Sequence, residues 1–249
     1  MKNHPPLLSL KGISKNFGAI RALEDISFDI FGGEVVALLG DNGAGKSTLV
    51  KIIAGGMAAT HGQIMFEGEE VHFKSPAEAK SAGIETVYQD LSLCTNVDVV
   101  ANFFMGRELV KRTFGIPVLD EHAMSSVVDK ALQSAGTVIP SLRINVEHLS
   151  GGQRQAIELN RFVHWGGKLV LLDEPFAALG VEQTRRGLAM IKRIAAQGIG
   201  IIMITHIMSQ AFQVADRMVV MRQGKIAGKV ICADTSPDKI VRLITGDAD

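Results

Sequence analysis

The chain has 249 residues, 47% of them apolar, so it can bury a full hydrophobic core as one large domain or as two lobes. Its 26 lysines and arginines balance its 26 aspartates and glutamates, so no overall field attracts nucleic acid or anionic lipid, although a local basic patch is compatible with this balance. The totals argue against a strongly basic nucleic-acid binder and otherwise select no partner.

The N-terminal stretch lacks the apolar core of a secretion signal, and no uninterrupted apolar run approaches the roughly 20 residues that span a bilayer. Two cysteines, Cys94 and Cys232, lie far apart without metal-ligand spacing. We therefore expect a cytoplasmic chain with free thiols in a reducing compartment.

In chain order, short apolar or alternating segments bounded by glycines predict antiparallel strands at 7–13, 26–31, 62–68 and 71–73. Compact β-branched runs, typical of strands buried on both faces of a parallel sheet, occur at 35–40, 85–89, 168–173 and 199–205. Helical patterns fall at 46–54, 76–82 with Ser75 as a cap, 120–135, 151–165 and 181–196.

The predicted fold class is therefore α/β, with a mainly parallel sheet, an N-terminal antiparallel β subdomain and an inserted α-helical subdomain. Residues 1–90 and 163–249 would form the core with the antiparallel subdomain. Residues 91–162 read as helices without intervening strands, and we assign them to the helical subdomain.

A buried strand runs into "GDNGAGKST", which fits the phosphate-loop pattern GxxxxGK[ST] between a strand and a helix. Glycines let backbone N–H groups turn around phosphate oxygens, and the helix N-terminus adds a positive dipole end. Lys46 would reach the β and γ phosphates, and Ser47 would offer its hydroxyl to Mg²⁺. The plain alternative is a glycine-rich turn. The proposed nucleotide-binding residues are Gly40, Asp41, Asn42, Gly43, Ala44, Gly45, Lys46, Ser47 and Thr48.

The segment "KLVLLDEP" supplies an acidic pair at the end of an apolar strand. Asp173 could hold Mg²⁺, directly or through water, and Glu174 is placed to polarise an attacking water. An isolated acidic pair after a strand is usually a solvated turn, but a phosphate loop in the same chain favours the catalytic interpretation.

The pentapeptide "LSGGQ" at 149–153 places Ser150, Gly151, Gly152 and Gln153 where a helix begins. With the phosphate loop, Gln89, the acidic pair and His206 in this order, the chain resembles the nucleotide-binding subunit of an ATP-binding cassette (ABC) transporter, essentially from residue 7 to 245. The pentapeptide is the discriminating part, because phosphate loops occur in many NTPase families.

The resemblance implies an ATPase in which two subunits pack head to tail. Ser150, the backbone amides of Gly151 and Gly152, and the helix N-terminus of one chain would then meet the γ-phosphate held by the other. Phe17 matches the aromatic residue that stacks on adenine, although a core phenylalanine is the alternative.

Two further polar positions are assigned by the same resemblance. Gln89 matches the residue that reports occupancy by Mg²⁺ and water, and it is one of the expected metal-binding positions. His206 matches the histidine that bridges the γ-phosphate and Glu174. A strand-end glutamine and a structural histidine are the alternatives.

Two positions depart from the family pattern "DEPTSALD", because this chain reads "DEPFAALG". Gly180 replaces an aspartate that crosses the dimer interface, and Phe176 replaces a small hydroxyl residue. The ending "AALG", with "GDNGAGKS" and "SGGQRQAIEL", resembles a branch of simple-sugar importers. Phe176 is unexplained by the sequence and could slow turnover by crowding the site beside Glu174.

The resemblance further implies separate membrane-spanning permease subunits, an extracytoplasmic solute-binding protein acting indirectly, and a peripheral position on the cytoplasmic face of the inner membrane. The permease would contact the helical subdomain at a surface including Val97, Val99, Val100, Phe103, Phe104 and Met105, which could equally be helical core. Two alternatives stay open: a non-transport ABC ATPase acting on ribosomes or DNA, and a nucleotide-gated assembly module with little hydrolysis. The sequence does not favour a nucleic-acid partner.

Overall fold

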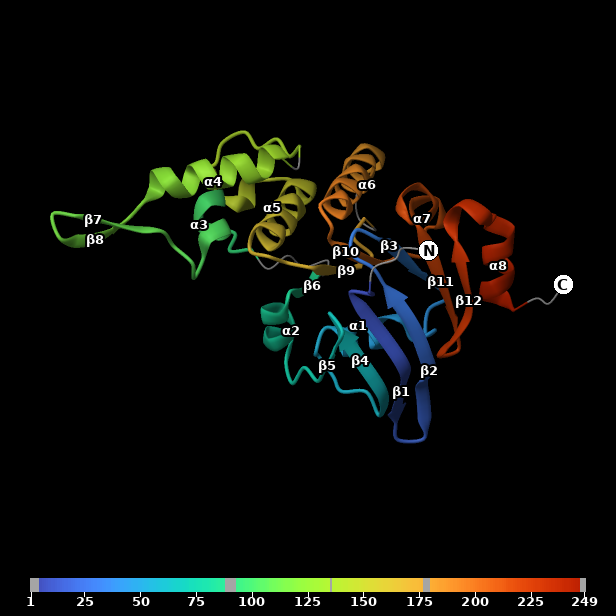
Figure 1. Ribbon diagram of the computed structural model, residues 1–249. Coiled ribbons are helices and arrows are strands. Elements are labelled where there is room, and N and C mark those ends of the chain that lie inside the picture. The colour runs from blue at the N-terminus through green and yellow to red at the C-terminus, as the bar shows by residue number, and fades with distance from the viewer. Residues whose placement is uncertain (1–4, 88–92, 135, 177–179, 247–249) are drawn as a thin grey trace. The chain divides into compact units, whose positions relative to one another are not determined.

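The protein is described by a computed structural model covering residues 5–87, 93–134, 136–176 and 180–246. It divides into two compact units. Unit 1 comprises residues 1–89, 167–177 and 191–249, and unit 2 comprises residues 90–166 and 178–190. Figure 1 shows the elements of each unit along the chain.

A four-stranded antiparallel sheet in unit 1 contains the strands expected at 7–13, 26–31 and 62–68, whereas its last strand lies at 69–71 and shares only Val71 with the strand expected at 71–73. Its order is β2-β1-β4-β5, and its strands are β1 (Leu8–Phe17), β2 (Ile20–Ile30), β4 (His61–Phe66) and β5 (Glu69–Val71). Along β2, Ile26, Phe28 and Ile30 are buried and alternate with less buried residues. Alternation places one face of this sheet against the core.

A six-stranded sheet in unit 1 has the order β12-β11-β3-β10-β9-β6. Its strands are β3 (Val35–Leu39), β6 (Ile84–Val87), β9 (Leu169–Asp173), β10 (Gly200–Ile204), β11 (Arg217–Arg222) and β12 (Lys225–Ile231). All neighbours pair in parallel except β11 with β12. Every residue of β3 and β10 is buried, as the continuous apolar runs predicted.

The remaining helices of unit 1 are α1 (Lys46–Ile53), α2 (Pro76–Ala82), α7 (Met208–Val214) and α8 (Pro237–Thr245), with a short 3₁₀ helix η2 (Cys232–Asp234). The Ser75 side chain accepts a hydrogen bond from Glu78 N and caps α2, as predicted. Leu49, Val50 and Ile53 of α1 belong to one core with residues of both sheets. This packing fixes the start of α1 at the end of β3.

Unit 2 contains α3 (Val99–Phe104), α4 (Glu121–Ser134), the 3₁₀ helix η1 (Val146–His148) and α5 (Gly151–His164). Its core includes Met124, Val128 and Leu132, which are spaced by four residues on one face of α4. The helix α6 (Val181–Ala196) begins in unit 2 and ends in unit 1. None of the helices in the described part of the chain has the length and apolarity needed to cross a membrane.

The expectation of helices without strands between residues 91 and 162 is wrong. An antiparallel hairpin of β7 (Val110–Thr113) and β8 (Ile116–Leu119) lies between α3 and α4. The stretch is short, its turn contains Phe114 where asparagine is usual, and Pro117 lowers strand propensity. These features concealed the hairpin from sequence patterning.

Candidate nucleotide-binding site

The loop between β3 and α1 has a backbone that only glycine accommodates at two positions. Gly40 has φ 144°, and a Cβ there would lie 2.2 Å from the carbonyl oxygen of Met221. Gly45 has φ 100°, and a Cβ would lie 2.8 Å from the carbonyl oxygen of Ala22. The loop thus turns tightly against neighbouring backbone before α1 begins, which leaves the first N–H groups of α1 without intrahelical acceptors.

Lys46, the first residue of α1, is buried and its ammonium group is held by backbone oxygens. Nζ donates to Gly40 O at 2.6 Å and to Asp41 O at 2.8 Å. Burial lowers the pKa of Lys46, whereas the charges of Glu174, Asp41 and Asp173 oppose that change. A cation therefore stands in the loop, next to the acidic pair at the end of β9.

Asp173 is the last residue of β9 and Glu174 follows it, at the edge of the sheet where the neighbouring parallel strands also end. Asp173 pairs in register with Ile204 of β10. Burial raises the pKa of Asp173, and the charge of Glu174 raises it further, while Lys46 and Lys51 act in the opposite direction. Glu174 has φ 47° and donates its backbone N–H to Ile204 O at 3.0 Å. The two carboxylates therefore stand side by side with incomplete charge compensation.

His206 lies two residues after the end of β10 and contacts Glu174. Its Nδ1 is 3.0 Å from Glu174 Oε1. Because a carboxylate only accepts, the ring donates from Nδ1 and its Nε2 remains for a further partner. The two side chains border an open hollow of about 310 Å³ lined by Leu39, Gly40, Asp41, Asn42, Glu174, Thr205, His206, Met208 and Ile244.

Thr205 and Gln210 were not anticipated from the sequence, yet both are buried close to His206 in the chain. Thr205 Oγ1 accepts from Ile207 N at 3.0 Å and donates to Gln210 Oε1 at 3.2 Å. This pair holds the backbone on both sides of His206. A polar pair five residues apart after a strand gives no recognisable sequence pattern, because the two side chains meet only through the turn between β10 and α7.

The remaining predicted positions of the loop region are also placed in unit 1. Ser47 is exposed and Thr48 is partly buried in the first turn of α1. Phe17 ends β1 with 47% of its surface exposed, and Lys15 Nζ lies 5.3 Å from its ring centre. An exposed aromatic face is available for stacking. Gln89 lies outside the described residues.

The residues at this site fit a nucleoside triphosphate and a magnesium ion. The loop offers a backbone cradle with an ammonium group at its base, and a Cβ at Gly40 or Gly45 would disrupt its tight turn by clashing with neighbouring protein atoms. The charge of the half-buried Asp173 carboxylate is only partly compensated, and oxygen donors such as this carboxylate and the Ser47 hydroxyl suit Mg²⁺. The described residues hold no cluster of three histidine, cysteine or acidic side chains that would indicate a transition-metal site.

The pentapeptide 149–153 lies in unit 2 and forms the N-terminus of α5. Ser150 is the N-cap, with its side chain accepting from Gln153 N, while Gln153 Oε1 accepts from Ser150 N at 3.0 Å. Gln153 Nε2 also donates to Val138 O at 3.3 Å. Gly151 and Gly152 therefore occupy the first helical positions, whose N–H groups point out of the helix end.

The two departures from the family pattern have simple local surroundings. The Phe176 side chain is only 2% exposed, so it belongs to the protein interior. Gly180 N donates to Gln183 Oε1 at 2.8 Å at the start of α6. Gln183 thus makes one of the two hydrogen bonds of a capping box. Gly180 has no side chain to make the other bond.

The predicted permease surface is mostly core. Val99, Val100, Phe103 and Phe104 are buried, whereas Met105 is exposed and Val97 is partly buried. The alternative interpretation as helical core therefore holds for the four buried side chains.

Residues 23–177 match the model of the ABC transporter family. The chain belongs to this family and carries an ATP-binding cassette, and its predicted fold class is confirmed.

Three curated relatives are import proteins. The chain is 43% identical to the xylose/arabinose import ATP-binding protein of Sulfolobus acidocaldarius, over 97% of this chain and 95% of that protein. It is 39% identical to the fructose import ATP-binding protein of Rhizobium meliloti, over 97% and 94%. It is also 36% identical to the ribose import ATP-binding protein of Yersinia pestis, over 98% of this chain but only 47% of that protein.

Solved structures agree on the fold. The ADP conformation of an ATP-binding cassette of an ABC transporter aligns with a TM-score of 0.81 at 24% identity, covering 98% of this chain and all of that one. A dimeric bacterial ABC transporter cassette aligns with a TM-score of 0.71 at 21% identity, covering 90% of this chain and 98% of that one.

Proposed function

We propose that this chain is the ATP-hydrolysing subunit of an ABC importer that takes up a simple sugar. Family membership and relatives named for xylose/arabinose, fructose and ribose import support the transport class. The observation that carries the hydrolytic assignment is the Glu174–His206 contact at the rim of the phosphate loop hollow.

The reaction is attack of water on the γ-phosphorus of ATP with cleavage of the bond to the bridging oxygen, giving ADP and phosphate. Glu174 Oε orients the water and accepts its proton. With a proton on each ring nitrogen, His206 donates from Nδ1 to the Glu174 carboxylate and from Nε2 to a γ-phosphate oxygen. Lys46 offsets charge on the β and γ phosphates. The proposed metal-binding residues are Ser47, Asp173 and Gln89, and Mg²⁺ bound by them would supply further charge neutralisation.

The pocket is completed by a second copy in a head-to-tail dimer. The capped N-terminus of α5 presents Ser150 and the amides of Gly151 and Gly152, a geometry suited to an anion. In this proposal it binds the γ-phosphate held in the partner's loop, while Phe17 stacks on the adenine. Unit 1 and unit 2 then correspond to the nucleotide-binding core and the helical subdomain.

The transport partners follow from the import relatives. The chain would sit against permease subunits on the cytoplasmic face of the inner membrane, with exposed Met105 in the contact surface. A solute-binding protein outside the membrane would act through the permease. The proposal includes no nucleic-acid partner.

The test is steady-state phosphate release by the purified chain with and without Mg²⁺. Glu174→Gln should lower the rate by about 10²- to 10⁴-fold while ATP binding persists. Glu182→Gln, a change of the same type on the exposed start of α6, serves as the control and should retain the rate. Normal hydrolysis by Glu174→Gln would remove Glu174 from its role.

The transport assignment requires a separate test. Native complexes should contain permease subunits, and a sugar presented by a binding protein should raise ATPase activity in liposomes. If the chain is isolated with ribosomes or DNA instead of permease subunits, the non-transport alternative is supported.

A further inference from the structure

The β7–β8 hairpin projects from the α3–α4 region of unit 2, and no other described element of that unit covers it (Figure 1). Every residue from 105 to 119 is exposed. Nearly half of the large apolar side chains that are exposed in the described chain lie in this hairpin and its base: Leu109, Val110, Phe114, Ile116, Val118 and Leu119. An apolar surface of this concentration indicates a contact outside the chain.

The residue at the tip of the hairpin, Phe114, has an unfavourable backbone conformation and an apolar side chain exposed to solvent. Phe114 and Gly115 form its turn, with φ 53° and 81°, so both adopt the left-handed conformation of a type I′ turn. Asparagine is favoured at the first position, and a bulky side chain there is rare. The Phe114 side chain is 100% exposed. Neither local conformation nor internal burial accounts for a phenylalanine at this point.

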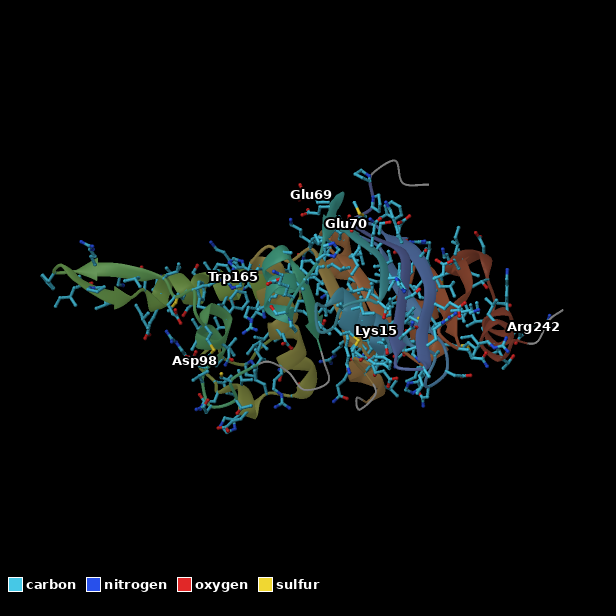
Figure 2. All side chains as sticks on the ribbon, turned by 90° about the horizontal axis from the view of Figure 1, so that it is seen from below. Lys15, Glu69, Glu70, Asp98, Trp165 and Arg242 are labelled. Carbon is cyan, nitrogen blue, oxygen red and sulfur yellow. The ribbon has the colours of Figure 1, made fainter. Side chains whose placement is uncertain are left out.

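Exposed apolar side chains occupy both faces of the hairpin. Cross-strand partners share a face, so Val110 and Leu119 lie on one face, and Ile116 and Val118 lie on the other. Figure 2 shows side chains extending to both sides of the projecting ribbon. A flat protein surface would cover one face only, whereas a fluid apolar medium surrounds both.

The hairpin edges and charges narrow the choice of partner. Pro117 and the adjacent cations Lys111 and Arg112 discourage pairing with a further strand, from a second copy or a peptide. No carboxylate in the described chain pairs with Arg112, and Lys111 makes only a 3.4 Å surface pair with Asp120. Residues 105–119 contain the cations Arg107, Lys111 and Arg112 and one acidic residue, Glu108, so the segment is positive in a chain that is neutral overall.

The base of the hairpin is anchored. Asp120 N donates to Leu109 O at 2.8 Å, and Asp120 Oδ1 accepts from Ala123 N at 3.2 Å at the start of α4. Arg107 stacks 4.9 Å from the ring centre of Trp165, which Figure 2 labels. The hairpin is therefore a fixed extension of unit 2.

We propose that the β7–β8 hairpin is an anchor for an anionic lipid surface. Phe114, Ile116 and their apolar neighbours enter the boundary between headgroups and acyl chains, and Lys111 and Arg112 contact lipid phosphates. This property goes beyond the proposed function, and it requires neither nucleotide nor permease.

The test is flotation of the full chain with vesicles of phosphatidylcholine mixed with phosphatidylglycerol, and with vesicles of phosphatidylcholine alone. The chain should float with the anionic vesicles, and less so as salt rises. Phe114→Asn should lower the partition coefficient by about ten- to a hundredfold, because it removes the largest inserting side chain. Arg112→Gln should lower it by about fivefold.

Matched controls separate binding from folding. Asn-Gly is the preferred pair for this turn, so Phe114→Asn should keep or raise the unfolding temperature. Val138→Asn removes another exposed apolar side chain of unit 2 outside the hairpin and should leave flotation unchanged.

The proposal is overturned if the unaltered chain fails to float at low salt, or if Phe114→Asn floats equally well. It is also overturned if the chain binds detergent-solubilised permease but not lipid vesicles, and if Phe114→Asn abolishes that binding to the permease. ATP hydrolysis measured without lipid reports on the proposed function alone, so the two can fail separately.

Discussion

Glu174 combines three local conditions that suit a residue acting on substrate. It has a positive φ at a non-glycine position, a neighbouring carboxylate, and a histidine at hydrogen-bond distance. A backbone in this region costs of order 1–3 kcal/mol and persists only where surrounding structure imposes it. The parallel pairing of β9 with β10 provides that constraint through the bond from Glu174 N to Ile204 O.

Thr205 should act as a positioning residue for His206. In Thr205→Val the Ile207 N–H and Gln210 Oε1 lose their shared partner, so we expect kcat to fall about tenfold with little change in KM for ATP. Thr205→Ser should restore the rate. Steady-state kinetics and thermal unfolding provide the measurements.

Thr86→Val is the matched control, because the Thr86 hydroxyl is buried without a hydrogen-bond partner among the described residues. Its loss should be neutral or slightly stabilising. Equal rate losses in the two valine variants would refute the positioning role.

Asp173 should make the nucleotide-free protein less stable near neutral pH. Because its pKa is raised by burial and by Glu174, the folded state favours the protonated form, and ionisation as pH rises above the unfolded value of 3.8 disfavours folding. Asp173→Asn, without Mg²⁺ or nucleotide, should therefore have a higher unfolding temperature near neutral pH. The difference should shrink as pH falls toward 3.8.

Thermal unfolding across this pH range measures the effect. A lower unfolding temperature for Asp173→Asn near neutral pH would mean that Lys46 and Lys51 stabilise the carboxylate more than burial and Glu174 destabilise it.

At the scale of elements, one residue at the N-terminus of α5, Ser150, is assigned two roles. The Ser150 hydroxyl caps the helix, and the proposal also assigns it a phosphate contact in the partner. The capping box with Gln153 explains why a serine followed by two glycines is stable there, since glycine is otherwise unfavourable within a helix.

The two roles are separable by substitution. Ser150→Ala should lose about 1 kcal/mol of stability as well as activity, because the cap disappears. Ser150→Asn keeps a good cap and should retain stability, yet it should lower ATPase activity because the phosphate contact is altered. Chemical unfolding and phosphate release measure the two effects. Full activity in Ser150→Asn would indicate a purely structural serine.

At the scale of the whole molecule, the central prediction is that each pocket takes residues from two chains. A chain with Lys46→Met and a chain with Ser150→Phe should each be inactive as homodimers. Mixed, they form heterodimers in which one pocket has both altered residues and the other has neither. The mixture should recover about one quarter of the unaltered activity, since half of the dimers are mixed and half of their pockets are intact.

The measurement is phosphate release after the two inactive chains are mixed and equilibrated. Absence of recovery, with heterodimers verified by differential tagging, would show that the pocket does not combine Lys46 of one chain with Ser150 of the other.

Local sequence determined the motifs and most of the regular elements. The strand, glycine-rich loop and helix around Lys46 are consecutive in the chain, so their conformation follows from local glycine geometry and a buried strand. Ser75 at the start of α2 and Ser150 at the start of α5 are local caps for the same reason. Residue patterns therefore located the candidate site and its family.

The tertiary structure decided which distant residues meet and which side chains stay exposed. Glu174 and His206 are brought together by parallel pairing of β9 with β10, and Thr205 contacts Gln210 only through the turn that follows. Phe176 is interior and Phe114 is fully exposed, although both are phenylalanines in loops. Burial and contact between distant segments depend on how the whole chain packs, and a local pattern contains no measure of that packing.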